Sequence, residues 1–116
     1  MASIYIFAAL GRFKSLNEMR QFIDKTYTED GDGIDSEFIR EVGLSAFEPM
    51  CIEAIYSESP KPLKQLLQES SYSDQWLPSL SILSEADSAI CVFEPNIVLH
   101  PERSSLRYCG VFTYDS

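Results

Sequence analysis

The residues in this sequence that are best able to do chemistry are carboxylates, and the spacing of three of them suggests a calcium loop. Asp30 and Asp32 stand where such a loop begins, and Glu41 stands at its twelfth position, where a bidentate ligand would close it. However, Ile34 occupies the place of a third oxygen ligand, and Asp35 occupies that of the sharp-turn glycine. The ligand set is incomplete, so no metal site is predicted.

The cysteines and the single histidine also fall short of a reactive constellation. His100 is not at zinc-ligand spacing from any cysteine. Cys51, Cys91 and Cys109 each lie among apolar residues, and an odd number without close spacing argues against a disulfide framework. We predict three buried free thiols and no cysteine nucleophile, since a reactive thiolate needs an accessible and polar setting.

Paired carboxylates leave one catalytic alternative open, a small hydrolase that uses residues such as Glu48 or Glu53 for acid and base work. A chain of 116 residues with one tryptophan offers little material for a deep sugar-binding cleft. The Gly31-x-Gly33 pair is too short and too acidic to cradle a phosphate. We therefore predict no catalytic residue, no cofactor and no enzymatic activity.

The carboxylates are concentrated in one stretch, from Tyr27 to Glu58. It contains nine acidic residues and one basic residue, Arg40, and so holds nearly all of the chain's net charge of −9. The nine are Glu29, Asp30, Asp32, Asp35, Glu37, Glu41, Glu48, Glu53 and Glu58. A one-sided field of this kind attracts a basic partner and speeds the encounter, although acidic runs also serve solubility alone.

Aromatic residues near the carboxylates could anchor such a partner. Tyr27, Tyr56, Tyr72 and Trp76 are of the types found at interfaces, with core packing as the competing interpretation for each. Carboxylates would steer and pair with a lysine- or arginine-rich target while the rings supply contact area. We select Tyr27 and Tyr56 as candidate contacts.

Length and composition fit one globular domain over residues 1–116. A 45% hydrophobic content supports a core without staples, and no apolar run approaches the length of a membrane span. The first ten residues lack the basic start and the cleavage site of a signal peptide, so a cytoplasmic protein is expected. A pI of about 4.4 argues against direct binding to nucleic acid.

Periodicity and capping signals define the first half of the chain. Ser3 to Leu10 predicts a strand buried on both faces, and Ser15 with Glu18 predicts a helix from Leu16. The inward positions of that helix are Leu16, Met19, Phe22, Ile23 and Tyr27. A turn at 30–33 precedes a second helix, which Asp35 or Ser36 caps and Gly43 ends. Alternation then predicts a strand from Met50 to Tyr56.

The second half reads as two helices followed by strands. Pro60 and Pro62 are placed in the first turn of a third helix, behind a Ser59 cap. A fourth helix is predicted over 73–85, with Trp76, Leu80 and Leu83 inward. Strands follow at 88–94 and 106–114, with a possible extension at 97–100. The order βααβααβ(β)β predicts an α+β (mixed α/β) domain with a mixed sheet of four to five strands and four helices.

Scattered short motifs along the chain resemble the immunity protein 22 family of bacterial polymorphic toxin systems. The motifs are Gly11-Arg12-Phe13-Lys14-Ser15 with Glu18, Tyr27-x-Glu29-Asp30-Gly31, Ser36-x-Phe38, Gly43-Leu44, Glu53 and Leu106-x-Tyr108-x-Gly110-x-Phe112. The resemblance covers most of the chain. It implies a small cytoplasmic α+β protein that neutralises a cognate toxin domain delivered by a neighbouring cell.

The chain also departs from that family pattern. Tyr5 stands where a tryptophan is usual in the first strand, and residues 7–10 look like an insertion. The acidic cluster expected before Glu53 is reduced to Glu48-Pro49-Met50.

The sequence as a whole therefore predicts an immunity protein with a basic partner, most simply a nuclease domain. An acidic adaptor domain without a toxin partner is the alternative. The predicted toxin-binding residues are Glu29, Asp30, Asp32, Asp35, Glu37, Glu41, Glu48, Glu53, Tyr27 and Tyr56.

Overall fold

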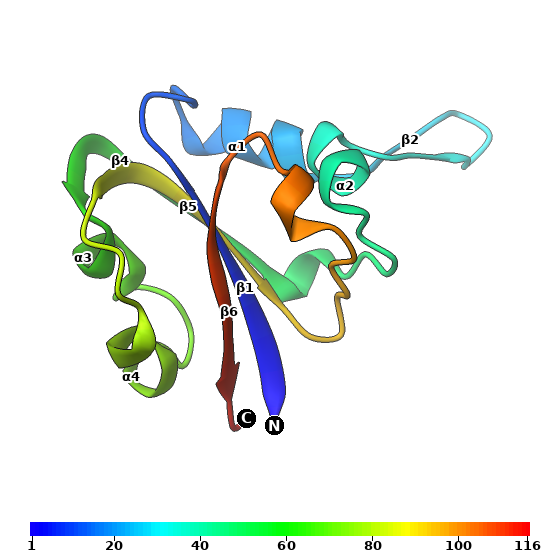
Figure 1. The fold of residues 1–116 in the computed structure, drawn as a ribbon. Coiled ribbons are helices and arrows are strands. Elements are labelled where there is room, and N and C mark those ends of the chain that lie inside the picture. Colours follow the sequence, from blue (N-terminus) through cyan, green and yellow to red (C-terminus); the bar gives the residue numbers. More distant parts are fainter.

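A four-stranded antiparallel sheet forms the centre of the computed structural model, which describes all of residues 1–116 (Figure 1). Its strands are β1 (Ala2–Ala9), β4 (Ile52–Pro62), β5 (Glu85–Phe93) and β6 (Arg107–Tyr114), in the spatial order β4-β5-β1-β6. Helices flank both faces, so the predicted α+β class is confirmed.

The sheet is not mixed, as the sequence predicted, because every neighbouring pair of strands is antiparallel. β1 and β4 do run in the same direction, as a helical crossover between them would give. However, β5 is inserted between them and runs the opposite way to both, so no parallel pair forms.

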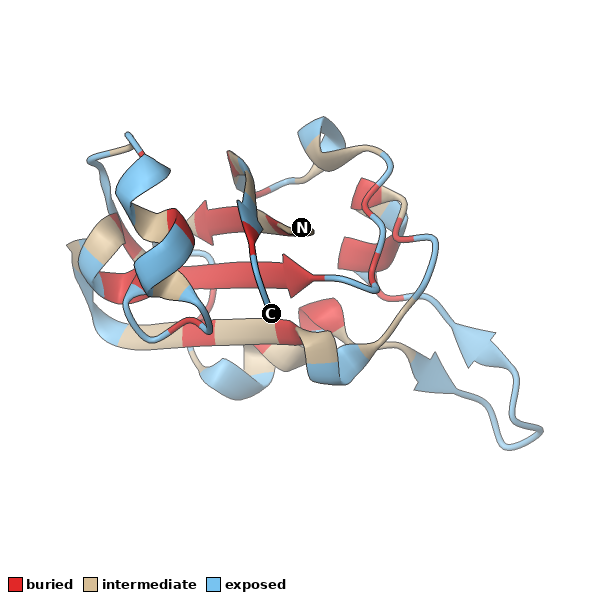
Figure 2. Ribbon diagram, turned by 90° about the horizontal axis from the view of Figure 1, so that it is seen from below, coloured by how far each residue is buried: buried red, intermediate tan, exposed pale blue.

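β1 is buried on both faces, as predicted, because helices cover the sheet on each side. Ile4, Ile6 and Ala8 point into one core and Phe7 points into the other, as the period of two for side chains in a strand requires. Figure 2 shows the resulting band of buried residues along the central strands.

The first core lies under α1 (Leu16–Ile23) and α2 (Glu37–Val42). Phe38 is fully buried there, in edge-to-face contact with Phe7 at a ring-centroid distance of 5.2 Å. The second core lies under α3 (Leu63–Leu67) and α4 (Ser73–Trp76), where Trp76 stacks on Phe112 at 5.9 Å.

Local capping signals account for where α1 and α2 begin and end. The Ser15 hydroxyl accepts the Glu18 backbone N–H at 3.0 Å, and the Ser36 hydroxyl accepts that of Ile39 at 3.2 Å. Gly43 takes the left-handed conformation at the end of α2, with φ of 64°. These predictions are confirmed, whereas Leu16 is 49% exposed and Tyr27 lies outside α1.

The largest errors of the sequence-based prediction fall between residues 57 and 85. Pro60 and Pro62 belong to the end of strand β4, and α3 begins only at Leu63. The predicted fourth helix is reduced to α4 and a 3-10 turn at Leu77–Ser79, where Pro78 lies. Leu80 is buried as expected, but Leu83 is 83% exposed.

Residues 97–100 do not form a further strand. They make a single antiparallel bridge, from Val98 to Leu44, and the loop beyond them contains a 3-10 turn at Pro101–Arg103. Pro49–Cys51 forms another such turn, so β4 starts at Ile52 rather than at Met50. The longest helix, α1, has eight residues, so none of the helices could span a membrane.

Candidate functional site

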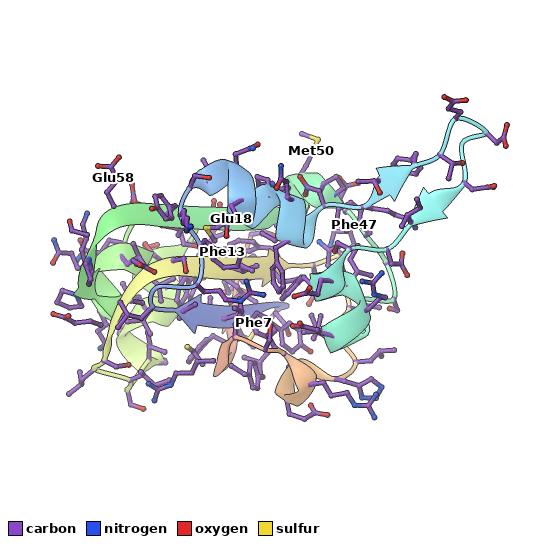
Figure 3. All side chains as sticks on the ribbon, turned by 90° about the horizontal axis from the view of Figure 1, so that it is seen from above. Phe7, Phe13, Glu18, Phe47, Met50 and Glu58 are labelled. Atoms are coloured by element: carbon purple, nitrogen blue, oxygen red, sulfur yellow. The ribbon has the colours of Figure 1, made fainter.

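A two-stranded hairpin between α1 and α2 carries three free carboxylates of the acidic stretch. Its strands are β2 (Thr26–Tyr27) and β3 (Gly33–Ile34), and it projects from the rest of the molecule (Figure 3). The Gly31 N–H donates to the Thr28 carbonyl and the Thr28 N–H to the Asp32 carbonyl, both at 2.9 Å. Gly31 has a φ of +85°, the left-handed conformation that follows the type I turn in a three-residue hairpin loop.

The side chains of Glu29, Asp30 and Asp32 are exposed at this hairpin tip. None of them forms an ion pair or a side-chain hydrogen bond within the chain. Tyr27 is 64% exposed on one face of the hairpin, and Ile34 is 48% exposed on the other. The tip therefore offers unneutralised negative charge next to apolar surface.

Two other predicted site residues already have basic partners within the chain. Glu37 forms a salt bridge with Arg12 at 3.0 Å, and Asp35 lies 3.6 Å from the Lys25 ammonium. Both pairs are largely exposed and weak, so they reduce the local charge without locking the side chains in place.

Three predicted site residues are acceptors for backbone or hydroxyl groups and so hold loops in place. Glu41 accepts from the Ser105 N–H at 2.8 Å and from its hydroxyl at 2.9 Å. Glu48 accepts from the Met50 N–H at 3.2 Å. Glu53 accepts from the Ser70 hydroxyl at 2.7 Å and from the Ser71 N–H at 3.1 Å.

The remaining predicted contact, Tyr56, is half-buried. Its hydroxyl donates to the Lys14 carbonyl at 2.8 Å and so ties β4 to the segment before α1. Trp76 is a core residue, only 1% exposed, whereas Tyr72 is 41% exposed. The structure thus separates the four aromatic candidates into Tyr27 and Tyr72 on the surface and the other two in structural roles.

The acidic stretch from Tyr27 to Glu58 does not form one continuous surface. In Figure 3 Glu58 lies at the opposite end of the molecule from the hairpin. Proximity in sequence is lost because β4 runs the length of the sheet between these positions. Within the acidic stretch, only the hairpin tip gathers several carboxylates without partners in one place.

The residues considered for metal or nucleophilic chemistry are not brought together. Glu41, which would close a calcium loop, binds Ser105 instead, and no group of three or more possible ligands lies together. The His100 ring lies beside Gly43 and 3.8 Å from Glu102 rather than near a cysteine.

A pocket of about 470 Å³, which the sequence did not predict, opens where β5 ends and β4 begins. Exposed Tyr72 and the carboxylates of Glu53 and Glu94 contribute to its walls, and we call it the Tyr72 pocket. Next to the pocket residues Glu94 and Pro95, the buried Asn96 side chain joins two loops: its oxygen accepts from the Glu48 N–H at 2.7 Å, and its nitrogen donates to the Phe93 carbonyl at 3.1 Å.

Cys51 also lines this pocket and is half-buried, contrary to the prediction that all three thiols are buried. Cys91 is fully buried, and burial raises its pKa to about 12. Burial also raises the pKa of the Cys109 thiol.

This difference predicts selective alkylation of the folded protein. Iodoacetamide at neutral pH should modify Cys51 first, whereas Cys91 and Cys109 should react roughly 1,000-fold more slowly, since they require unfolding. Peptide mass spectrometry over a time course measures the three rates, and urea-unfolded protein is the control in which they converge. Equal rates in the folded protein would contradict the burial described here.

Comparison with known proteins identifies the family of the chain independently of this geometry. A family model described as Immunity protein 22 matches residues 6–115, which is nearly the whole chain. No curated protein and no solved structure gives a significant match. The family match agrees with the resemblance found in the sequence motifs, and the chain belongs to the immunity protein 22 family.

Proposed function

We propose that this chain neutralises a cognate toxin domain by binding a basic surface of the toxin through the hairpin tip, without catalysing a reaction itself. Family membership implies an inhibitor that binds a toxin. The observation that supports the hairpin is its set of three exposed carboxylates without partners, Glu29, Asp30 and Asp32. The encounter would take place in the cytoplasm of the protected cell.

Electrostatics favours a nuclease as the toxin. A nuclease must present lysine and arginine residues to phosphates, so its active site is a positively charged surface. Charges of opposite sign across an interface speed association and select the partner, while a few buried anchors set the lifetime of the complex. Tyr27, exposed beside the tip, is the candidate anchor on the hairpin.

The other carboxylates contribute to binding in a different way. Asp35, Glu37, Glu41, Glu48 and Glu53 add to the negative field of the chain, but each already has a partner within the fold. Those partners hold these side chains in place, whereas the tip carboxylates are free to reach a basic surface. Inhibition then follows when the projecting hairpin occupies the basic site and excludes the nucleic acid.

The test is co-expression of the chain with a candidate toxin domain, sought first among the genes next to its own. We expect growth to be restored, a stable complex to co-purify, and the toxin's nuclease activity to fall in proportion to the chain added. Cell death in the presence of soluble, folded chain would contradict the proposal. Activity that persists in a purified complex would contradict occlusion of the active site.

A further inference from the structure

The Tyr72 pocket has an aromatic wall made from three separate parts of the chain. Tyr72 stacks on Tyr114 with ring centroids 4.8 Å apart and an interplanar angle of 21°. Phe93 meets Tyr114 edge-on at 5.5 Å. Tyr114 and Phe93 are buried, whereas Tyr72 is 41% exposed, so the Tyr72 ring is the accessible part of this wall.

Two carboxylates lie in the same pocket, and no basic residue lines it. Glu94 accepts from the Ser3 N–H at 2.6 Å, and Glu53 is held by Ser70 and Ser71. Neither takes part in a salt bridge. Neutral donors therefore fix both groups in position but leave their negative charges without a cation.

The charge of Glu94 also acts on the neighbouring Tyr114. The pKa of Tyr114 is raised, first by burial and then by the negative charge of Glu94. A negative potential that disfavours a phenolate favours a cation in the same space.

Tyr72 itself adopts a backbone conformation that side chains disfavour. It is the only non-glycine residue with positive φ, at 58°, and it immediately precedes α4. This conformation places the ring against Tyr114 at the pocket wall, and the Trp76 indole N–H donates to the adjacent Ser71 carbonyl at 3.1 Å. The fold thus retains an unfavourable backbone conformation that presents an aromatic ring beside two carboxylates.

We propose that the Tyr72 pocket receives one arginine side chain of the bound toxin. This inference rests on the proposed function and adds a second, anchoring contact to it. A guanidinium group stacks flat on a tyrosine face. Its N–H groups, which point outward in the plane of the group, can then donate to carboxylates beside the ring. An anion would be repelled by Glu53 and Glu94, and an apolar group would leave both charges unpaired. Lysine carries the charge but lacks the planar group that stacks.

Met50 contributes an apolar side chain to the pocket and is 91% exposed. A flexible thioether at the mouth suits contact with the methylene stem of an arginine.

The pocket can be tested without any toxin, by NMR titration of the ¹⁵N-labelled chain with N-acetyl-arginine methylamide. We expect weak, saturable shifts centred on the amides of Cys51, Tyr72 and Glu94. The neutral isostere N-acetyl-citrulline methylamide should bind about tenfold more weakly, since it lacks the charge. Shifts that do not saturate, or equal binding of the two probes, would overturn the assignment.

Variants with a matched control locate the binding groups. Glu94→Gln should weaken arginine binding about tenfold and Tyr72→Leu about fivefold, because each removes one favourable interaction with the cation. Glu85→Gln makes the same charge change at the other end of β5, where the carboxylate has no side-chain partner, and should leave binding unchanged. A loss as large in Glu85→Gln would show a response to net charge rather than a pocket.

With the toxin domain in hand, the double variant Glu94→Gln/Tyr72→Leu separates the two proposals. We expect dissociation of its toxin complex to be at least about tenfold faster at a nearly unchanged association rate. Wild-type dissociation of this variant would overturn the pocket while leaving the proposed function intact. If the unmodified chain failed to bind the toxin, the proposed function would fall and the arginine titration would decide on the pocket.

Discussion

Reversing Glu29, Asp30 and Asp32 to lysine is expected to slow association with the cognate toxin domain roughly 10- to 100-fold at low salt. The hairpin tip would then repel the basic surface that it is proposed to attract. The difference from the unmodified chain should shrink as salt is added, because the screening length falls to about 10 Å near 0.1 M. Stopped-flow or biosensor kinetics over a salt series measures both effects.

The matched control reverses Glu58, Glu69 and Glu85 to lysine, which gives the same change in net charge elsewhere on the surface. These side chains are exposed and lie outside the hairpin. Both triple variants should fold with stability changes of about 0.5 kcal/mol or less per site, since no buried group is touched. If both variants slow association equally, only net charge matters. If neither does, the hairpin is not the contact.

Sequence signals were sufficient where the determinants of structure are local. The Ser15 cap, a second cap at Asp35 or Ser36 (in the structure, Ser36) and the helix end at Gly43 were predicted because each acts within one turn of its own helix. The nearly continuous apolar run of β1 predicted burial on both faces for the same reason, since two neighbouring layers demand apolar residues at most positions of a central strand.

The errors lie where long-range pairing overrides local preference. Pro60 and Pro62 suggested a helix start, but β4 is an edge strand, and proline is tolerated on the side of an edge strand that has no neighbour. The irregular register between Tyr56 and Lys61 accommodates this segment. The insertion of β5 between β1 and β4, which makes the sheet antiparallel, depends on contacts between distant segments that no local pattern encodes.

The candidate site shows the same limit. The sequence located the acidic stretch but could not distinguish free carboxylates from structural ones, because the partners are remote in the chain. Glu41 accepts a hydrogen bond from Ser105, and Glu53 accepts hydrogen bonds from Ser70 and Ser71. The Tyr72 pocket was missed because its walls come from both ends of the chain and from its middle, so its charges and rings share no stretch of sequence.

Replacing Phe38 with alanine is expected to lower the free energy of unfolding by about 3–5 kcal/mol, a large part of the total for a domain of this size. Phe38 is fully buried, contacts Phe7 edge-to-face at 5.2 Å and lies 5.8 Å from the Phe22 ring. Alanine would leave a cavity between α2 and the sheet. Leucine at the same position keeps most of the volume and should cost only about 1–1.5 kcal/mol.

Trp76 provides the measurement, because the only tryptophan is buried in the second core, on the other face of the sheet. Urea unfolding followed by its fluorescence should shift in parallel with unfolding followed by circular dichroism, since the two cores share the strands of one sheet. Ile34→Ala, at an exposed hairpin position, is the control and should change stability by about 0.5 kcal/mol or less. A fluorescence transition unaffected by Phe38→Ala would mean that the two cores unfold separately. The sheet would then not couple its hairpin face to the face that carries the Tyr72 pocket.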